Sequence, residues 1–252
     1  MELELRDVSC EYRSGEKIQP ALQHISLQVR SQEFLAIVGP SGCGKSTLLN
    51  VVGGFLAPTS GQVLAGADLV LGPGADRMMI FQKSALFPFL TVAGNVEYGL
   101  KLRGIPRDEL RKRRDDVLAS VNLSAFANMF PKELSEGMRK LVEIARALVL
   151  RAPVLLFDES LGNLDALTRY QMQQLIQEIW TEHRPTTLWV THDLEEAVLL
   201  ADRVVMLSHR PGRVVAVKSI SLGRPRTELT RTSSELQAIR QELFGRLELN
   251  RT

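Results

Sequence analysis

The sequence has few cysteines, few aromatic residues and no long apolar run. Its 252 residues include two cysteines, Cys10 and Cys43, and only 6% aromatic residues. Two cysteines are too few for a disulfide framework, which indicates a reducing compartment. The longest apolar stretches, such as VVGGFLA, fall far short of the roughly 20 residues that a membrane-spanning helix needs. Contact with a membrane is therefore expected only through a partner.

The chain also lacks an excess of charge of either sign. It has 31 Lys and Arg against 29 Asp and Glu, a formal net charge of +2. This balance argues against a nucleic-acid partner, for which a basic excess is typical. The acidic opening MELELRD lacks the basic-then-apolar pattern of a signal peptide, so a cytosolic setting is expected.

What is present is an alternation of short apolar runs with helix-period stretches. The runs EFLAIVG, PVLLFDE and TTLWVTHD are typical of parallel strands that are buried on both faces. The Gly- and Pro-rich residues 57–76 predict turns and short strands. A helix-rich stretch follows from about residue 84 to residue 150. The pattern predicts an α/β fold with a helical subdomain.

The strongest chemical signal is GPSGCGKST, which lies between the apolar strand FLAIV and the helix TLLNVV. It fits the phosphate-loop pattern G-x-x-x-x-G-K-[ST], and a plain glycine-rich turn would not need its lysine and serine. Backbone N–H groups of such a loop surround the β-phosphate, the lysine reaches the outer phosphates, and the serine ligates Mg²⁺. The residues predicted to bind nucleotide here are Gly39, Pro40, Ser41, Gly42, Cys43, Gly44, Lys45, Ser46 and Thr47.

Cys43 lies inside this loop, at the predicted start of a helix. A helix start lowers the pKa of a nearby thiol if its sulfur is accessible. We therefore expect Cys43 to react with maleimide and bound nucleotide to protect it.

Adjacent acids end a second apolar strand, VLLFDES. Because the carboxyl ends of parallel strands meet at one edge of a sheet, Asp158 is expected beside the phosphate loop as a Mg²⁺ ligand. Glu159 suits the base that orients an attacking water. A third strand ends in VTHD, which places His192 at the same edge as a γ-phosphate sensor. The alternative for the two acids is an ordinary turn at the end of a strand, without a role in catalysis. The alternative for His192 is a purely structural role.

With these motifs in this order, nearly the whole sequence resembles the ATP-binding-cassette (ABC) family. The stretch LSEGM is similar to the family signature LSGGQ, LLFDE to Walker B, and NLD to the D-loop. Gln82 matches the Q-loop glutamine and His192 the switch histidine. Tyr12 fits the aromatic that stacks on adenine, although an aromatic on an early strand is otherwise more often part of the core.

The resemblance implies a P-loop NTPase core with a mainly parallel sheet, an N-terminal antiparallel β region and a helical subdomain. The implied single domain comprises a nucleotide-binding core (1–83 and 151–215), the helical signature subdomain (84–150) and a short C-terminal tail (216–252). ATP and Mg²⁺ are the implied cofactors. The implied catalytic residues are Glu159, His192 and Gln82, and the implied metal ligands are Ser46, Gln82 and Asp158.

Two kinds of partner follow from the family. Two ATPase subunits, identical or closely related, close head to tail, and Ser135, Gly137 and Asp165 of one help to complete the nucleotide site of the other. The segment Gln82 to Asn95 contacts a transmembrane permease. Its apolar residues favour a partner surface over a local core: Leu86, Phe87, Phe89 and Leu90.

Longer stretches resemble the ATPases of nitrate, sulfonate and taurine importers. These are LAGADLVLGPGADRMMIFQ, LDALTRYQMQQLIQEIW and THDLEEAVLLADRVVMLSHRPGRV. The resemblance implies a peripheral subunit on the cytoplasmic face of the membrane, which couples Mg·ATP hydrolysis to the uptake of a small anion. A solute-binding protein is an indirect partner, and the solute itself is not fixed.

Four residues depart from the family pattern. They are Glu136 for Gly and Met138 for Gln in the signature, Ser160 for Pro after Walker B, and Asn163 for a small residue in the D-loop. With Ser135 as N-cap, the glutamate lies in the first helical turn, where the helix dipole favours it by ~0.3–1 kcal/mol. Aimed at a γ-phosphate ~5 Å away, it would be repelled by roughly 3 kcal/mol at an effective dielectric constant of ~20. We therefore expect Glu136 to turn toward Arg139 or Lys140.

Two other functions remain open from the sequence. One is a non-transport ABC ATPase that works on nucleic acid or ribosomes, although such proteins usually carry two cassettes or long coiled inserts, which are absent here. The other is a weakly active or regulatory nucleotide-binding subunit of a heterodimer, in which Glu136 marks the degenerate site.

Overall fold

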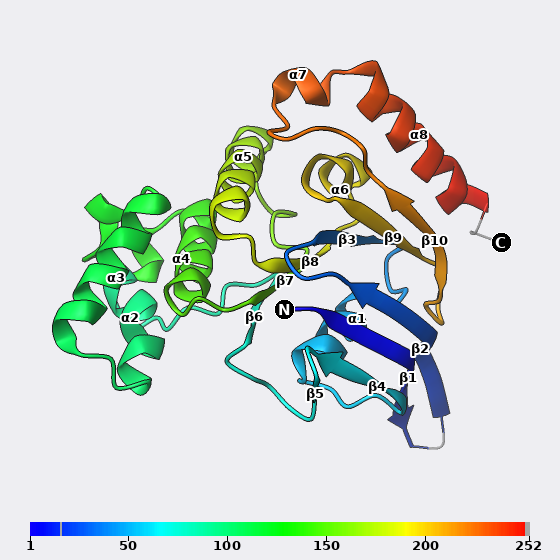
Figure 1. Ribbon diagram of the computed structural model, residues 1–252, viewed down its shortest axis with the longest axis horizontal. Coiled ribbons are helices and arrows are strands. Elements are labelled where there is room, and N and C mark those ends of the chain that lie inside the picture. The colour runs from blue at the N-terminus through cyan, green and yellow to red at the C-terminus, as the bar shows by residue number, and fades with distance from the viewer. Residues whose placement is uncertain (16, 250–252) are drawn as a thin grey trace.

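Two β-sheets and the helices packed around them make up the structure, a computed structural model that describes residues 1–15 and 17–249 (Figure 1). A four-stranded antiparallel sheet has the order β2-β1-β4-β5, and a six-stranded sheet has the order β10-β9-β3-β8-β7-β6. All neighbouring strands of the larger sheet are parallel except β9 and β10. The predicted fold, a mainly parallel sheet with an N-terminal antiparallel β region, is confirmed.

The strands of the two sheets are β1 (Leu3–Ser14), β2 (Lys17–Val29), β3 (Phe34–Val38), β4 (Ser60–Ala65), β5 (Asp68–Leu69), β6 (Arg77–Ile80), β7 (Val154–Asp158), β8 (Thr186–Val190), β9 (Arg203–Leu207) and β10 (Val214–Ser219). The helices are α1 (Lys45–Gly53), α2 (Val92–Leu102), α3 (Arg107–Ser120), α4 (Glu136–Val149), α5 (Ala166–His183), α6 (Leu194–Leu200), α7 (Glu228–Arg231) and α8 (Ser234–Leu249), with short 3-10 turns η1 (Ser124–Phe126) and η2 (Pro131–Glu133).

The three central strands are buried on both faces. In β3, Phe34 and Ala36 face an apolar core shared with α4, α5 and α6, whereas Leu35 and Ile37 face a second core shared with α1 and the antiparallel sheet. Continuous apolar sequence is what such a strand requires, because neither of its faces meets water. This explains why FLAIV, VLLF and TTLWV show no polar alternation.

Helices α2, α3 and α4 form a group beside the sheets, drawn in green in Figure 1. The group is joined to the larger sheet by a continuous apolar core that includes Val96 of α2, Leu118 of α3 and Ile144 of α4. It contains the predicted helical subdomain, whose boundaries at residues 84 and 150 stay a prediction. Within the described residues, no helix combines the length and apolar character that a membrane crossing needs.

Arg226 fixes the C-terminal segment to α6. Its guanidinium is buried, with 1% of the residue exposed, and donates to the carbonyl oxygens of Val198 and Ala201 at 2.7 Å and of Leu222 at 3.0 Å. The last carbonyls of a helix have no partner within the helix, so the arginine satisfies the end of α6. Burial lowers the pKa of Arg226 to about 10.

We expect Arg226→Met to lower the free energy of unfolding by about 3 kcal/mol, because several buried carbonyls lose their donor at once. Urea unfolding measures the change. Arg6→Met is the control, since Arg6 lies on the surface and pairs with Glu4 at 2.7 Å in water. Equal stability of the two variants would contradict the capping role.

Candidate functional site

The phosphate loop connects β3 to α1 and depends on glycine. Gly42 and Gly44 have positive φ angles of 76° and 109°, which L side chains rarely adopt. A Cβ at Gly44 would also lie 2.7 Å from the carbonyl oxygen of Ala21. Helix α1 begins directly after the loop and has no side-chain cap at its start. Its first amides are therefore available to an anion.

Lys45, the first residue of α1, lies over this loop. The residue is 5% exposed, and Nζ donates to the carbonyl oxygens of Gly39 at 2.9 Å and Pro40 at 3.1 Å. The same ammonium lies 3.6 Å from Oε1 of Glu159. A polyphosphate held by the loop would offer this lysine anionic acceptors in place of the two carbonyls.

A cavity of about 180 Å³ opens beside the loop. Its lining comes from β1, β2, the phosphate loop, α1, the end of β7 and the turn before β10. The residues are Tyr12, Ala21, Gly42, Gly44, Lys45, Ser46, Thr47, Glu159 and Arg210. The hydroxyl of Tyr12 lies 3.1 Å from Oγ1 of Thr47. The structure thus brings the predicted stacking aromatic to the predicted phosphate loop.

Ser46 and Asp158 form a pair of oxygen donors at the same edge. Oγ of Ser46 donates to Oδ1 of Asp158 at 2.9 Å. Burial raises the pKa of Asp158, and the hydrogen bond from Ser46 opposes this rise. No three His, Cys, Asp or Glu side chains gather as a metal cluster in residues 1–15 and 17–249. Mg²⁺ fits a hydroxyl and one carboxylate, because it takes oxygen ligands and keeps phosphates and waters as the others.

Glu159 and His192 meet at the ends of β7 and β8. Oε2 of Glu159 lies 3.3 Å from Nδ1 of His192, and the amide of Glu159 donates to the carbonyl of Val190 at 3.0 Å. The φ of Glu159 is +43°, an uncommon value for a residue with a side chain. Ser160, which stands at the usual proline position, is buried, and its Oγ lies 3.4 Å from the carbonyl oxygen of Ile80 on β6. That contact and the hydrogen bond from the amide of Glu159 to Val190 hold the turn that carries Glu159.

The structure does not bring Gln82 into this cluster. The residue is exposed on the loop that follows β6, and its side chain has no hydrogen-bond partner among the described residues. It also does not line the 180 Å³ cavity. Its predicted roles in catalysis and metal binding therefore need a movement of this loop.

Ser135, Gly137 and Asp165 lie apart from the phosphate loop. Ser135 is the N-cap of α4, as predicted, and its Oγ accepts from the amide of Met138 at 3.3 Å. Ser135 and Gly137 line a separate groove of about 540 Å³ between α3, α4 and α5. Asp165 caps α5, and hydrogen bonds from Thr168 lower the pKa of its carboxyl group. None of the three lines the cavity at the loop of the same chain.

Glu136 lies in the first turn of α4, as predicted, but the predicted partners are wrong. Its Oε1 accepts from Nδ2 of Asn163 at 3.4 Å. Lys140 is instead buried against Glu143 at 3.1 Å, and Nε of Arg139 donates to the carbonyl of Leu134. Two residues that depart from the family pattern, one in the signature and one in the D-loop, thus face each other.

The expectation of a reactive, low-pKa thiol at Cys43 is also wrong. The residue is 1% exposed and packs under the loop, where a Cβ at Gly39 would meet its Sγ at 2.9 Å. Burial raises the pKa of the thiol, and this effect exceeds the opposing effect of Lys45. Cys43 therefore packs beneath the phosphate loop and is shielded from alkylating reagents.

Sequence reasoning missed three residues near this edge. Nη2 of Arg169 donates to the carbonyls of Gly162 and Leu164 and so holds the D-loop. Glu196 is buried and lines a small pocket together with His192, and desolvation raises the pKa of its carboxyl group. Arg210 joins the cavity from the turn after β9. Arg169 follows the D-loop aspartate by one helical turn, which is a usable signal, but nothing local marks the other two.

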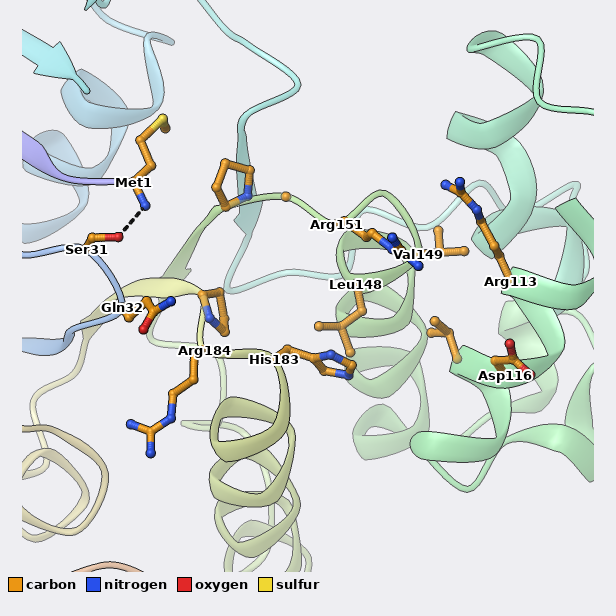
Figure 2. A pocket seen from close by; sticks show the side chains of 14 residues that line it. Met1, Ser31, Gln32, Arg113, Asp116, Leu148, Val149, Arg151, His183 and Arg184 are labelled. Carbon is orange, nitrogen blue, oxygen red and sulfur yellow. Dashed lines mark hydrogen bonds between the residues drawn. The ribbon is translucent and has the colours of Figure 1, made fainter. Parts of the chain in front are cut away.

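A larger cavity of about 510 Å³ lies at the opposite edge of the sheet (Figure 2). Gln32, Pro153 and Pro185, which precede β3, β7 and β8, are among its lining residues, as are Arg113 and Arg151. Its lining includes none of the predicted site residues. Because parallel strands place their carboxyl ends at one edge, this cavity is remote from the phosphate loop.

Residues 22–162, more than half of the chain, match the ABC transporter family. The chain therefore belongs to this family and is an ATP-binding, ATP-hydrolysing ABC cassette. It is 48% identical over 197 residues to the taurine import ATP-binding protein TauB of Chromobacterium violaceum, covering 78% of this chain and 76% of that protein. It is 46% identical over 217 residues to TauB of Burkholderia thailandensis, covering 86% and 84%.

Solved structures of ABC cassettes are similar as well. The dimeric bacterial ABC transporter cassette MJ0796 has a TM-score of 0.77 and 33% identity, covering 88% of this chain and 100% of that chain. A structure of the same cassette in a post-hydrolysis state with ADP and Pi has a TM-score of 0.75, 31% identity and the same coverage. The cassette cbiO1 of Clostridium perfringens has a TM-score of 0.78 and 26% identity, covering 98% and 97%.

We expect Glu159→Gln to keep ATP affinity while turnover falls by at least ~100-fold and a closed dimer accumulates, because the change removes the predicted water-orienting base and leaves the phosphate loop intact. Lys45→Ala should instead abolish nucleotide binding. Nucleotide titration, phosphate release and gel filtration with ATP separate the two effects. Normal turnover in Glu159→Gln, or normal ATP affinity in Lys45→Ala, would remove that residue from its role.

We expect Glu136→Gly to change turnover by less than ~tenfold, the equivalent of ~1.4 kcal/mol, since the carboxylate already faces Asn163. Asn163→Ala should lower turnover in the otherwise wild-type protein, because it removes the hydrogen bond that holds the carboxylate of Glu136. In a Glu136→Gly background, where that carboxylate is absent, the same change should lower turnover less. Ser135→Arg should nearly abolish turnover. A rise of ~100-fold in Glu136→Gly would show that the glutamate is a brake on the site.

Proposed function

We propose that this ABC ATPase is the energising subunit of an importer for a small sulfonate- or nitrate-like anion. The observation that carries the proposal is the cluster at the carboxyl edge of the sheet, where Glu159 lies 3.6 Å from Lys45 and 3.3 Å from His192. A carboxylate held between a phosphate-binding lysine and a histidine suits hydrolysis as well as binding. The identity to two taurine import proteins supports the solute class.

Each side chain has a distinct proposed role in hydrolysis. Lys45 and the amides at the start of α1 bind the outer phosphates. Glu159 orients the attacking water, and His192 contacts the γ-phosphate while its other nitrogen stays with Glu159. Gln82 joins when its loop closes on the nucleotide. Tyr12 stacks on adenine.

Ser46 and Asp158 are the residues that would hold Mg²⁺, with Gln82 as the further proposed ligand. The ion would neutralise charge on the outer phosphate oxygens. The hydrogen bond between Ser46 and Asp158 keeps the two oxygens together, and burial of Asp158 strengthens its attraction for a cation.

A second subunit completes the proposed site. Ser135, Gly137 and Asp165 do not line the phosphate-loop cavity of their own chain. In a head-to-tail dimer, the hydroxyl of Ser135 and the start of α4 would face the γ-phosphate of the other subunit. The similarity to a dimeric ABC cassette supports this arrangement.

Residues 82–95 are the proposed contact with a permease. Asn95 is fully buried, and its side-chain oxygen accepts from the amide of Phe87 at 2.8 Å while its nitrogen donates to the carbonyls of Leu90 and Thr91. The loop is therefore held in one shape. Phe89, at its tip, is 70% exposed, although its ring lies 5.8 Å from that of Phe87. A fixed loop that presents a phenylalanine to solvent suits a protein partner.

The permease would place the subunit at the cytoplasmic face of the membrane, with a solute-binding protein as an indirect partner. The alternative of a weakly active regulatory subunit is less well supported, because Glu136 contacts Asn163 and does not line the cavity at the loop. A non-transport ATPase is not favoured by any contact in the described residues.

Reconstitution tests the proposal. The purified ATPase, its permease and its solute-binding protein are placed in liposomes, and ATP hydrolysis is measured with taurine, an alkanesulfonate, nitrate or a sugar. We expect stimulation by one of the anions and none by the sugar. Sugar-dependent stimulation, or hydrolysis indifferent to the permease, would overturn the importer assignment.

We expect Phe89→Ser to abolish the association with the permease while the ATPase rate of the isolated subunit stays within about twofold of wild type, since the ring is exposed and does not line the cavity at the phosphate loop. Leu229→Ser is the control, because Leu229 is 83% exposed on α7 in the C-terminal segment. Co-purification with the tagged permease measures the effect. Equal retention of the two variants would contradict the contact.

A further inference from the structure

The turn between β9 and β10 packs directly on the phosphate loop. Gly212 donates its amide to the carbonyl of Ala21 at 2.8 Å, and its own carbonyl accepts from the amide of Gln23 at 2.9 Å. A Cβ at Gly212 would overlap the carbonyl oxygen of Cys43, so the two backbones are in close contact. A segment distant in sequence thus forms one wall of the nucleotide site.

Arg210 is the side chain that this turn brings to the nucleotide cavity. It lines the cavity with Tyr12 and Lys45. Its Nε donates to the carbonyl of Pro20 at 3.0 Å, which anchors the guanidinium to β2. No described residue accepts a hydrogen bond from its two terminal nitrogens, and no described carboxylate forms an ion pair with it.

The anchor sets where in the cavity this charge lies. Pro20 is paired with Glu11 of β1, next to the pair of Gln19 with Tyr12. Arg210 is therefore anchored beside the strand pair that carries Tyr12, the residue proposed to stack on adenine. Lys45 is held elsewhere, by the carbonyls of Gly39 and Pro40 and by Glu159. The cavity is thus lined by two cations that are anchored to different segments.

We propose that Arg210 is a nucleotide-binding residue that donates from its terminal nitrogens to the α-phosphate. A planar guanidinium with a free pair of N–H groups matches two phosphate oxygens, and such charge-assisted bonds are the strong ones. In the proposed site, Lys45 and the loop amides bind the outer phosphates. The α-phosphate, between these and the nucleoside, is the group that the Pro20 anchor leaves within reach of Arg210.

The inference rests on the ATP site of this cassette and is independent of the transported solute. If ATP hydrolysis proved not to be coupled to a permease, the proposal for Arg210 would be unaffected. Conversely, a loss of nucleotide contact at Arg210 would leave the importer proposal standing.

The test compares Arg210→Gln with Arg213→Gln by titration calorimetry with ATP and ADP. Gln keeps a polar side chain at position 210 but removes the positive charge and the planar pair of N–H donors. We expect Arg210→Gln to weaken both nucleotides by about tenfold, because both carry an α-phosphate and a bond to a charged group is worth about this factor. The turnover number at saturating ATP should stay close to wild type while KM rises.

Arg213 provides a matched control in the same turn. Its Nε donates to Oε1 of Gln23 at 3.1 Å, and it does not line the cavity. Arg213→Gln should therefore bind ATP and ADP as wild type does. Arg210→Lys keeps the charge without the planar pair of N–H donors. Its affinity for ATP and ADP should lie between those of wild type and Arg210→Gln.

Three outcomes would overturn the proposal. They are unchanged affinity in Arg210→Gln, a loss confined to ATP, which would point to the γ-phosphate, and an equal loss in Arg213→Gln. The melting temperature without nucleotide is measured for every variant. If the melting temperature of Arg210→Gln falls enough to account for its weaker binding, Arg210 only anchors the turn on Pro20. That result would also contradict a direct contact with the nucleotide.

Discussion

The parallel pairing of β3, β7 and β8 is the constraint on which the site depends. Their registers align Ile37, Asp158 and Val190 at one edge of the sheet. The residues that follow these strands, the phosphate loop, Glu159 and His192, are therefore brought together although they are far apart in the chain. Burial of both faces of the sheet holds this edge rigid, because the two apolar cores leave the strands no room to shift.

Close backbone packing adds a second constraint around the phosphate loop. Gly44 contacts the carbonyl of Ala21, Gly212 contacts both Ala21 and Cys43, and Gly39 contacts Leu207 and the sulfur of Cys43. The loop is thus enclosed by β2, β9 and its own cysteine. This packing explains why the thiol of Cys43 is buried, and it couples the turn after β9 to any ligand that the loop holds.

The signature helix and the D-loop are coupled inside one subunit. Ser135 caps α4, Asp165 caps α5, and Glu136 and Asn163 join the two starts. A Cβ at Gly137 would meet Thr168 at 2.9 Å, so the two helices are also in close contact there. A displacement of one helix start would therefore shift the other, and both lie on the surface proposed to meet a second subunit. Glu136 and Asn163, two of the residues that depart from the family pattern, therefore form one hydrogen-bonded pair.

The sequence by itself determined the fold class, the phosphate loop, the acids at the end of β7 and the N-cap of α4. These depend on local patterns: continuous apolar strands, glycines with special backbone angles, and a serine before a helix. Only the tertiary structure decided which partner Glu136 takes, that the Cys43 thiol is buried, and that Gln82 lies away from the cluster. It alone placed Arg210 and Glu196 beside residues remote in sequence. Burial and long-range contacts arise from packing between segments, and no local pattern specifies them.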